Sequence, residues 1–366
     1  MMYIWQHGEW PKMTWQEASF STLLSEVNLL RGQLLGIVSM FGFKEKNEVL
    51  LHALTQEIVH SAKIEGQELS RDSVRSSVAR QLGLEYIGLP ASDHYTEGVV
   101  QVMFDATSRY DDIFDEERLF VWHRALFPTG QSGIHKIDVG IWRQGEGAMQ
   151  VVSGVLGHEK VHYEAPDNSM VPAMMKQFIE WLNNDEVQID PVVKAAVAHL
   201  WFVTIHPFDD GNGRLCRTIT ELLLSKADKT SQRYYSLSSE LLNHRKDYYQ
   251  HLEEAQKGNL DITEWIIWFL EQMKLALEAS LKRTEAVMNK MQFWSKHKET
   301  VLNERQRKVI NMVLDGFKGK LTSSKWYKIC HCSQDTATRD LNDLIAKGII
   351  VKSAEGGRNT SYELII

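Results

Sequence analysis

Cysteine, proline and long apolar runs are all scarce in this sequence. Its 366 residues include three cysteines and seven prolines. Three cysteines are too few for the disulfide framework of a secreted domain, and the N-terminus lacks a signal-peptide pattern, so we expect a cytoplasmic protein. The longest segment without Asp, Glu, Lys or Arg is the 14 residues Ala195–Phe208. Because a membrane-spanning helix needs about 20 apolar residues, no span is predicted.

A metal site built on cysteine is also excluded by spacing. Cys330, His331 and Cys332 adjoin one another, but no second pair of ligands follows at the intervals that zinc sites use. Cys216 is predicted to be a small buried side chain. The remaining composition, 43% hydrophobic and 24% charged, is that of ordinary globular domains.

Charge is unevenly distributed along the chain. Residues 301–366 hold 11 Lys or Arg and 7 Asp or Glu, a net charge of +4, whereas the whole chain carries −7 and the first 300 residues therefore −11. This asymmetry indicates a separate C-terminal module that could approach an anion such as DNA.

Helical periodicity dominates the first 300 residues, with apolar side chains three and four positions apart. It predicts helices over Phe20–Leu34, Asn47–Ala62, Leu119–Ala125, Met170–Leu182, Val192–Ile205, Arg214–Leu224 and Ile262–Leu277. Valine-rich runs around a glycine turn at Gln150–Tyr163 predict a β-hairpin. The sequence therefore predicts an all-α protein with one small hairpin.

The C-terminal module has a different order of elements. We predict helices over Asn303–Leu314, Trp326–Ile329 and 333–346, then strands at Ile349–Val351 and Ser361–Ile365. This is the order of a winged helix. Its recognition helix would present Gln334, Thr336, Thr338 and Arg339 to DNA. A protein–protein or dimerisation module of the same fold is the alternative.

The string His206-Pro-Phe-Asp-Asp-Gly-Asn-Gly-Arg-Leu-Cys-Arg217 concentrates groups that suit phosphate chemistry. Proline ends the preceding helix, the glycines permit a tight turn, and a new helix begins near Gly213 with free N–H groups that attract anions. Arg214 and Arg217 lie three apart on one helix face, Asp210 is a hard-metal ligand, and His206 is expected to titrate near neutrality as a base. The structural alternative is a helix–turn–helix with ion pairs and a buried histidine.

The same string resembles the motif of the Fic family, H-x-F-x-[D/E]-G-N-G-R-x-x-R, at every fixed position. The resemblance extends over about 113–226 and implies an all-α core with a small hairpin. It also implies AMP transfer from ATP, with Mg²⁺, to a Ser, Thr or Tyr hydroxyl of a target protein. The roles it implies are base for His206, core anchor for Phe208, metal ligand for Asp210, and phosphate binding for Gly211, Asn212, Gly213, Arg214 and Arg217.

Two further segments resemble the nucleotide site and the target-binding flap of this family. The hairpin residues Val151, Val152, Ser153 and Gly154 match the flap, along which an extended target segment could add. Tyr248, Tyr249 and Gln256 resemble the adenine side, with core packing as the alternative for the tyrosines.

An upstream string, Ser61-Ala-Lys-Ile-Glu65-Gly66, resembles the inhibitory motif of the same family. The resemblance implies inhibition in cis, with Glu65 forming an ion pair with Arg217. It places this chain in a subclass with an N-terminal inhibitory helix at about residues 47–66.

These observations lead to one principal function and two alternatives. The principal one is a protein adenylyltransferase that also modifies itself. The alternatives are removal of AMP at the same site and a DNA-binding regulator in which the Fic domain is regulatory. We expect an N-terminal extension over 1–95, a catalytic core over 96–280, a helical connector over 281–300 and a winged helix over 301–366. Dimers are common in the family, so a homodimer is a further expectation.

Overall fold

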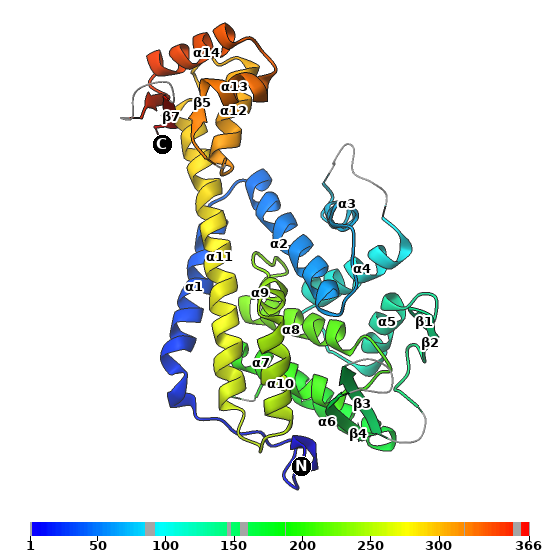
Figure 1. Ribbon diagram of the computed structural model, residues 1–366. Helices are drawn as coiled ribbons and strands as arrows, with labels where there is room; N and C mark the ends of the chain where they lie inside the picture. Colours follow the sequence, from blue (N-terminus) through cyan, green and yellow to red (C-terminus); the bar gives the residue numbers. More distant parts are fainter. Residues whose placement is uncertain are drawn as a thin grey trace. The chain divides into compact units, whose positions relative to one another are not determined.

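The structure, a computed structural model, describes residues 2–84, 92–144, 148–153, 160–186, 188–317, 319–353 and 360–365 (Figure 1). The chain divides into two compact units, Met1–Ser280 and Leu281–Ile366. Helix α11 (Thr263–Lys296) contributes to both. The connector predicted at 281–300 is therefore the second half of one long helix as far as Lys296.

The first unit is helical, as the periodicity predicts. After two short 3₁₀ turns its helices are α1 (Ser21–Ser39), α2 (Phe43–Ile64), α3 (Arg71–Gln81), α4 (His94–Ser108), α5 (Glu116–Leu126), α6 (Val171–Asn183), α7 (Pro191–Ile205), α8 (Asn212–Asp228), α9 (Leu237–Asn243) and α10 (Arg245–Gln256). Each predicted helix is present. All of them extend beyond the predicted C-terminal residue except α7, which ends at the predicted Ile205, and three begin one residue later than predicted. Helices α3, α4 and α9 were not predicted from the sequence.

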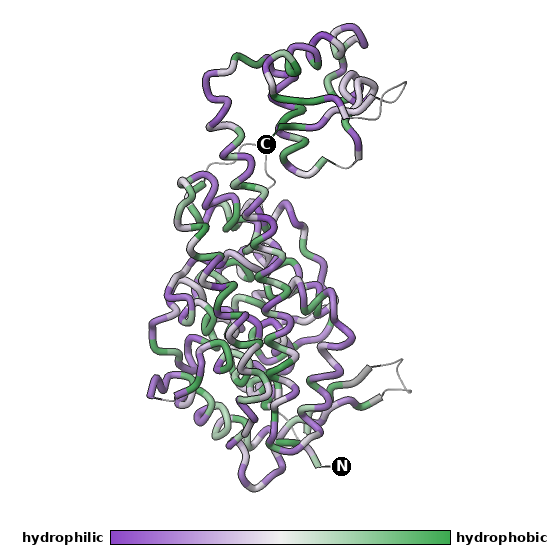
Figure 2. The backbone as a smooth tube through the Cα atoms, turned by 90° about the vertical axis from the view of Figure 1, so that its left-hand side faces the viewer, coloured by the Kyte–Doolittle hydropathy of each residue, from purple (hydrophilic) through white to green (hydrophobic). Residues whose placement is uncertain are grey.

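Helix α7 is the centre of this unit, because every residue from Val192 to Ile205 is buried. A helix that is mostly apolar on all sides has to be surrounded by other elements, and the 14-residue segment without Asp, Glu, Lys or Arg supplies most of α7. Helix α8 packs along α7 after the short loop 206–211. Hydrophobic and hydrophilic stretches alternate along much of the chain, as in helices with one covered face (Figure 2). The loop between α7 and α8 is therefore held by the two best-packed helices.

Two antiparallel hairpins lie beside this helical core. The predicted hairpin is present as β3 (Ala148–Ser153) and β4 (Lys160–Asp167), with register shifts between Ala148 and Gln150 and between Val151 and Val152. A smaller hairpin, β1 (Gln131–Ser132) with β2 (His135–Lys136), was not predicted, because two-residue strands leave no periodicity to detect.

The second unit contains α12 (Glu304–Leu314), β5 (Leu321–Thr322), α13 (Ser323–Cys330), α14 (Gln334–Ala346), β6 (Ile350–Lys352) and β7 (Ser361–Leu364). Its strands form an antiparallel sheet in the order β5-β7-β6. The helices and the last two strands follow the predicted order, and β5 is an addition. Trp326 is fully buried at the centre of a core formed by residues of α12, α14 and β6.

Two absences concern the described residues. None of the helices in that part of the chain is both long and apolar enough to cross a membrane. No group of three or more His, Cys, Asp or Glu side chains there is arranged to hold a metal ion, and this includes Cys330, His331 and Cys332.

Candidate active site

The loop between α7 and α8 has a backbone that only certain residues can adopt. His206 follows the last helical residue in a left-handed conformation, φ 52° and ψ 59°, which costs a non-glycine residue about 1 kcal/mol. Gly211 is also left-handed, at φ 84°. Asn212 closes the loop, since its side chain accepts from the N–H of Phe208 at 3.0 Å and donates to the same residue's carbonyl at 2.7 Å. Both ends of this amide are thus engaged by the loop, whereas the resemblance implied a phosphate contact.

Phe208 anchors the loop in the core, and a histidine that the sequence analysis did not single out supports it. The buried ring of His123 stacks on Phe208 with centroids 4.1 Å apart. The N–H of Gly140 donates to Nδ1 of His123, so Nε2 carries the proton and donates to the carbonyl of Asp210 at 3.1 Å. Burial lowers the pKa of His123 to about 4, which keeps this neutral tautomer. No motif marks His123, because it lies in α5, more than 80 residues before the loop.

His206 presents one ring nitrogen for chemistry. Its Nδ1 lies 3.2 Å from the carbonyl of Val203, which assigns the proton to Nδ1 and leaves Nε2 as an acceptor. The expectation that His206 titrates near neutrality is wrong. The surrounding protein desolvates the imidazolium and lowers the pKa of His206 to about 4, so the ring is a neutral base at pH 7.

The two motif arginines lie buried at the start of α8, each with its own partners. Arg217 donates from Nε and Nη2 to the hydroxyl and the carbonyl of Ser61, both at 2.8 Å. Its Nη1 lies 2.8 Å from Oε1 of Glu65. This ion pair raises the pKa of Arg217, against the opposing effect of burial.

Arg214 has a different environment from Arg217. Its Nη1 donates to Oε1 of Gln67 at 2.9 Å and to the hydroxyl of Tyr95 at 2.7 Å, and its guanidinium lies over the ring of Phe127. Nε and Nη2 are buried without a hydrogen-bond partner in the described residues. Two donors therefore remain available to an anion. Gln67 and Tyr95 were not predicted from the sequence, since neither belongs to a motif.

The carboxylate of Glu65 lies against the first turn of α8. A Cβ added to Gly213 would lie 2.0 Å from Oε1 of Glu65, so any other residue here would displace the Glu65 carboxylate from its present place. Gly213 has a helical backbone, so its glycine leaves room for this carboxylate and is not needed for a left-handed φ. Glu65 caps the end of α2, and Gly66 follows at φ 77°. A negative group thus already occupies the N-terminus of α8, where helices attract anions.

Two successive aspartates face the β1–β2 hairpin. The carboxylate of Asp210 accepts a hydrogen bond from the Ser132 hydroxyl, and its Oδ1 lies 3.7 Å from Nη2 of Arg214. Asp209 accepts from the N–H of Asp138 at 2.9 Å. Asp210 keeps 39% of its side chain exposed, so it can reach a ligand in the site.

The β3–β4 hairpin includes the flap residues Val151, Val152 and Ser153, whose backbones pair with β4. Gly154, the fourth residue of the predicted flap, lies outside the described residues. The hydroxyl of Tyr163 in β4 donates to the carbonyl of Thr204 at 2.6 Å. The hairpin is therefore fastened to the end of α7, next to His206.

The residues predicted for the adenine side lie on α10. Tyr248 is buried against Trp265 and Trp268, and its hydroxyl lies 2.8 Å from Nε2 of His199, an arrangement of core packing. Tyr249 keeps 39% of its surface exposed and donates to the carbonyl of Ile64 at 3.3 Å. Gln256 is buried, with Nε2 3.5 Å from the carbonyl of Val203.

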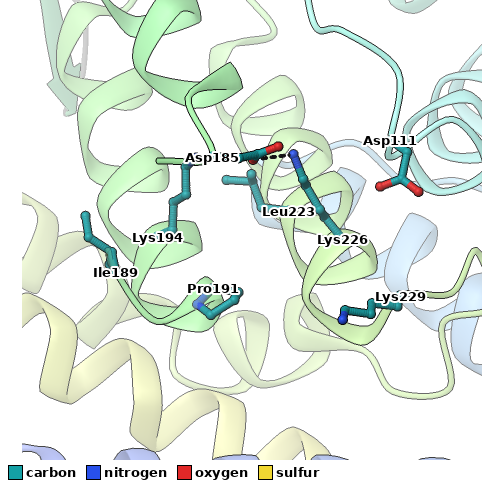
Figure 3. A pocket seen from close by; sticks show the side chains of 8 residues that line it. All are labelled: Asp111, Asp185, Ile189, Pro191, Lys194, Leu223, Lys226 and Lys229. Carbon is teal, nitrogen blue, oxygen red and sulfur yellow. Dashed lines mark hydrogen bonds and ion pairs between the residues drawn. The ribbon is translucent and has the colours of Figure 1, made fainter. Parts of the chain in front are cut away.

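A separate cavity of about 410 Å³ lies at the other end of the α7–α8 pair, between the start of α7 and the end of α8 (Figure 3). Its lining includes Lys194, Lys226 and Lys229. The ammonium of Lys226 is paired with Asp185 at 2.6 Å, and that of Lys194 donates to the carbonyl of Asn184. Because α7 separates this cavity from His206 by about 20 Å, at 1.5 Å per residue, it takes no part in the loop site.

Comparison with known proteins agrees with this geometry. The Fic/DOC family model matches residues 113–224, and a domain of unknown function, DUF4172, matches residues 3–84. The chain is 29% identical over 218 residues to "Protein adenylyltransferase Fic" of Aedes aegypti, and that match covers 57% of this chain but 38% of the mosquito protein. The protein of the same name from Nematostella vectensis is 25% identical over 272 residues, or 72% of this chain and 56% of the other. The chain thus spans well under two thirds of these relatives.

Solved structures share the fold. A Fic family protein from Desulfovibrio desulfuricans G20 superposes with a TM-score of 0.57 and 21% identity, covering 97% of this chain and 98% of the other. Fic-1 from C. elegans superposes with a TM-score of 0.51 and 22% identity, covering 75% of this chain and 74% of the other.

Proposed function

We propose that this chain, whose residues 113–224 form a domain of the Fic/DOC family, is a protein adenylyltransferase. It would transfer AMP from ATP to a hydroxyl group of a target protein and to itself. The main support for the proposal is that a neutral His206 lies at the start of the loop 206–211, and that two buried arginines follow this loop in the first turns of α8. The curated relatives named protein adenylyltransferase support it independently.

The groups of the loop divide the reaction between them. Arg214, Arg217 and the first N–H groups of α8 would bind the triphosphate and neutralise its charge. Nε2 of His206, which holds a lone pair, would take the proton of the incoming hydroxyl. That hydroxyl oxygen then bonds to the α-phosphorus while the bond to pyrophosphate breaks. Catalysis in this scheme is positioning plus electrostatic stabilisation.

Asp210 fits a magnesium ion that arrives with the nucleotide. Mg²⁺ is commonly held by one or two carboxylates together with substrate phosphates, and Asp210 offers one exposed carboxylate beside Arg214. The ion would neutralise phosphate charge when bound. Because the described residues include no cluster of three acidic or imidazole ligands, this chain would not hold the ion tightly without nucleotide.

We further propose that Glu65 inhibits the enzyme in cis. Its carboxylate lies where a phosphate would bind Arg217 and the first turn of α8. The helix that carries it is anchored two turns earlier, since buried Glu57 accepts hydrogen bonds from the Ser238 N–H at 2.9 Å and the Ser236 hydroxyl at 2.8 Å. A rigid helix thus holds a negative charge in the anion site.

The experiment is incubation of the purified chain with ATP and Mg²⁺, followed by intact-mass spectrometry. A covalent increase of one AMP is the expected result, small in the parent chain, larger in Glu65→Gly, and absent when His206→Ala is added. Because the base acts on the hydroxyl and not on ATP, His206→Ala should still bind ATP with nearly the affinity of the parent chain. A chain that gains no AMP, even when Glu65 is replaced by glycine, would refute the proposal.

A second function, DNA binding, is favoured by the second unit. Its element order is that of a winged helix, and α14 exposes Gln334, Thr338 and Arg339 on the face away from its core. The net charge of +4 over 301–366 suits a polyanion. Fluorescence anisotropy with duplex DNA over a salt series tests this proposal. Binding that weakens with salt and with Arg339→Ala supports it, and unchanged anisotropy at low salt refutes it.

A further inference from the structure

Arg143 is a buried arginine that no motif includes, and it lies directly behind the candidate base. Its side chain is 2% exposed. Nε donates to the carbonyl of His206 at 2.7 Å, and its own backbone N–H donates to the carbonyl of Pro207 at 2.9 Å. One residue thus holds both peptide groups at the turn where the chain leaves α7.

The same guanidinium reaches the end of the flap hairpin. Nη2 donates to the carbonyl of Pro166 in β4 at 2.5 Å, and Nη1 donates to the side chain of Asn168 just after β4. Nη2 also lies 3.5 Å from the carbonyl of Ile205. Arg143 therefore bridges the base of the flap and the last residues of α7.

These contacts complete a series at the end of α7, where the last four carbonyls have no partner within the helix. The carbonyl of Phe202 accepts from the N–H of His206, and that of Thr204 accepts from the hydroxyl of Tyr163. The guanidinium of Arg143 lies against the next two carbonyls, those of Ile205 and His206. The left-handed backbone of His206 is thus fixed from the flap side, by Tyr163 and Arg143.

We infer that Arg143 is a positioning residue for the candidate base: it holds His206 in its left-handed conformation and makes the placement of the imidazole depend on the flap. The inference rests on the proposed adenylyl transfer for its kinetic consequence, though not for its structural one. Only an arginine can serve His206, Pro166 and Asn168 together, because its planar fork offers five donors in fixed directions.

The positive charge of Arg143 also favours the neutral form of the His206 ring. A positive group behind His206 disfavours the protonated ring, whereas Glu65 and Asp210 favour it, and desolvation outweighs both. Among the described residues the acceptors of the guanidinium are carbonyl and amide oxygens, and no carboxylate there forms an ion pair with it.

The test uses the full chain carrying Glu65→Gly, so that transfer is measurable, with Arg143→Gln, Arg143→Lys and the control Arg109→Gln added singly. The Arg109 side chain is 57% exposed, and among the described residues it pairs with Asp105 in α4 and with Asp112 just after α4. We expect Arg143→Gln to lower kcat about 10²-fold, the cost of misplacing a catalytic group, while the Kd for ATP stays within about twofold. Arg143→Lys should recover part of kcat, and Arg109→Gln should match the parent. A folded Arg143→Gln chain with unchanged kcat, or one that loses ATP affinity in proportion to kcat, would overturn the inference.

A second measurement does not depend on activity. The ¹⁵N chemical shifts of the His206 ring, assigned by comparison with His206→Ala, should report the Nδ1–H tautomer in the parent and a mixture of tautomers in Arg143→Gln. An unchanged tautomer would refute the positioning role. If no variant transfers AMP, the proposed function fails while the ring shifts still decide the role of Arg143.

Discussion

Replacing Glu65 by glycine should activate AMP transfer, and the structure allows the size of the effect to be worked out. Oε1 of Glu65 lies 2.8 Å from Nη1 of Arg217, and the two side chains are 28% and 2% exposed. A hydrogen bond between charged groups contributes about 1.5–3 kcal/mol. Freeing Arg217 for a phosphate thus corresponds to about 10- to 150-fold, at 1.4 kcal/mol per tenfold.

Charge repulsion adds to this figure. A carboxylate about 4 Å from a phosphate charge costs up to about 4 kcal/mol at an effective dielectric constant of 20, and solvent around the part-exposed Glu65 reduces this. We therefore expect activation of Glu65→Gly between about 10-fold and 10³-fold. The fold should tolerate the change, because Glu65 lies at the end of α2 and Arg217 keeps both of its bonds to Ser61.

The assay is incorporation of α-labelled ATP into the chain itself, with thermal unfolding measured alongside. Glu65→Gln, which keeps the shape and removes the charge, should give an intermediate rate. Glu68→Gly is the matched control, because this carboxylate is exposed three residues further on and should leave the rate unchanged. If Glu65 were an ordinary surface carboxylate, its ion pair would be worth about 0–1 kcal/mol and its removal would not activate. An unchanged rate in a folded Glu65→Gly chain would therefore refute the reasoning.

Four further predictions concern the candidate site and its independence from the second unit. Because the pKa of His206 is about 4 and the neutral ring is active, the pH–rate profile should stay level down to about pH 5 and fall below it; a midpoint near 6.5 would contradict this. Gly213→Ala should abolish ATP binding by calorimetry even with Glu65→Gly, since the added Cβ occupies the anion site. Asp210→Ala should abolish transfer, and any residual Mg²⁺-dependent labelling would show that the metal ligand is another residue. Deletion of residues 300–366 should leave ATP binding intact, and loss of it would make the second unit part of the core.

The fold was largely predictable because its central helices are strongly periodic or wholly apolar. The apolar periodicity of Val192–Ile205 predicted a helix that ends before Pro207, and α7 ends at Ile205. The helices α3 and α4 were missed because their buried positions include Ser77, Thr96 and Gly98, which carry little apolar periodicity. Strand β5 is two residues long and pairs with β7 from the far end of the unit, so local sequence could not indicate it.

The residues of the candidate site were also predictable only in part. Its loop residues were predictable because 12 consecutive positions carry them. The supporting residues His123, Arg143 and Tyr95 were not, since they reach the loop from α5, from the segment between β2 and β3, and from α4. They contact the loop through its backbone carbonyls or through Arg214. The basicity of His206 was misjudged for a related reason: the pKa depends on desolvation by elements that no motif contains.

Glu65 and a triphosphate would compete for one anion site, and this constrains how inhibition can be relieved. The absence of a side chain at Gly213 leaves the space that Oε1 of Glu65 takes in this structure. The carboxylate is tethered, which gives it an effective concentration in the millimolar range or above, so raising ATP alone would displace it poorly. We therefore expect relief of the proposed inhibition to require movement of the end of α2. The hydrogen bonds of Glu57 to Ser236 and Ser238, and those of Arg217 to Ser61, would resist that movement. We therefore expect regulation of the proposed activity to act on the packing of α2 against α8 and α9.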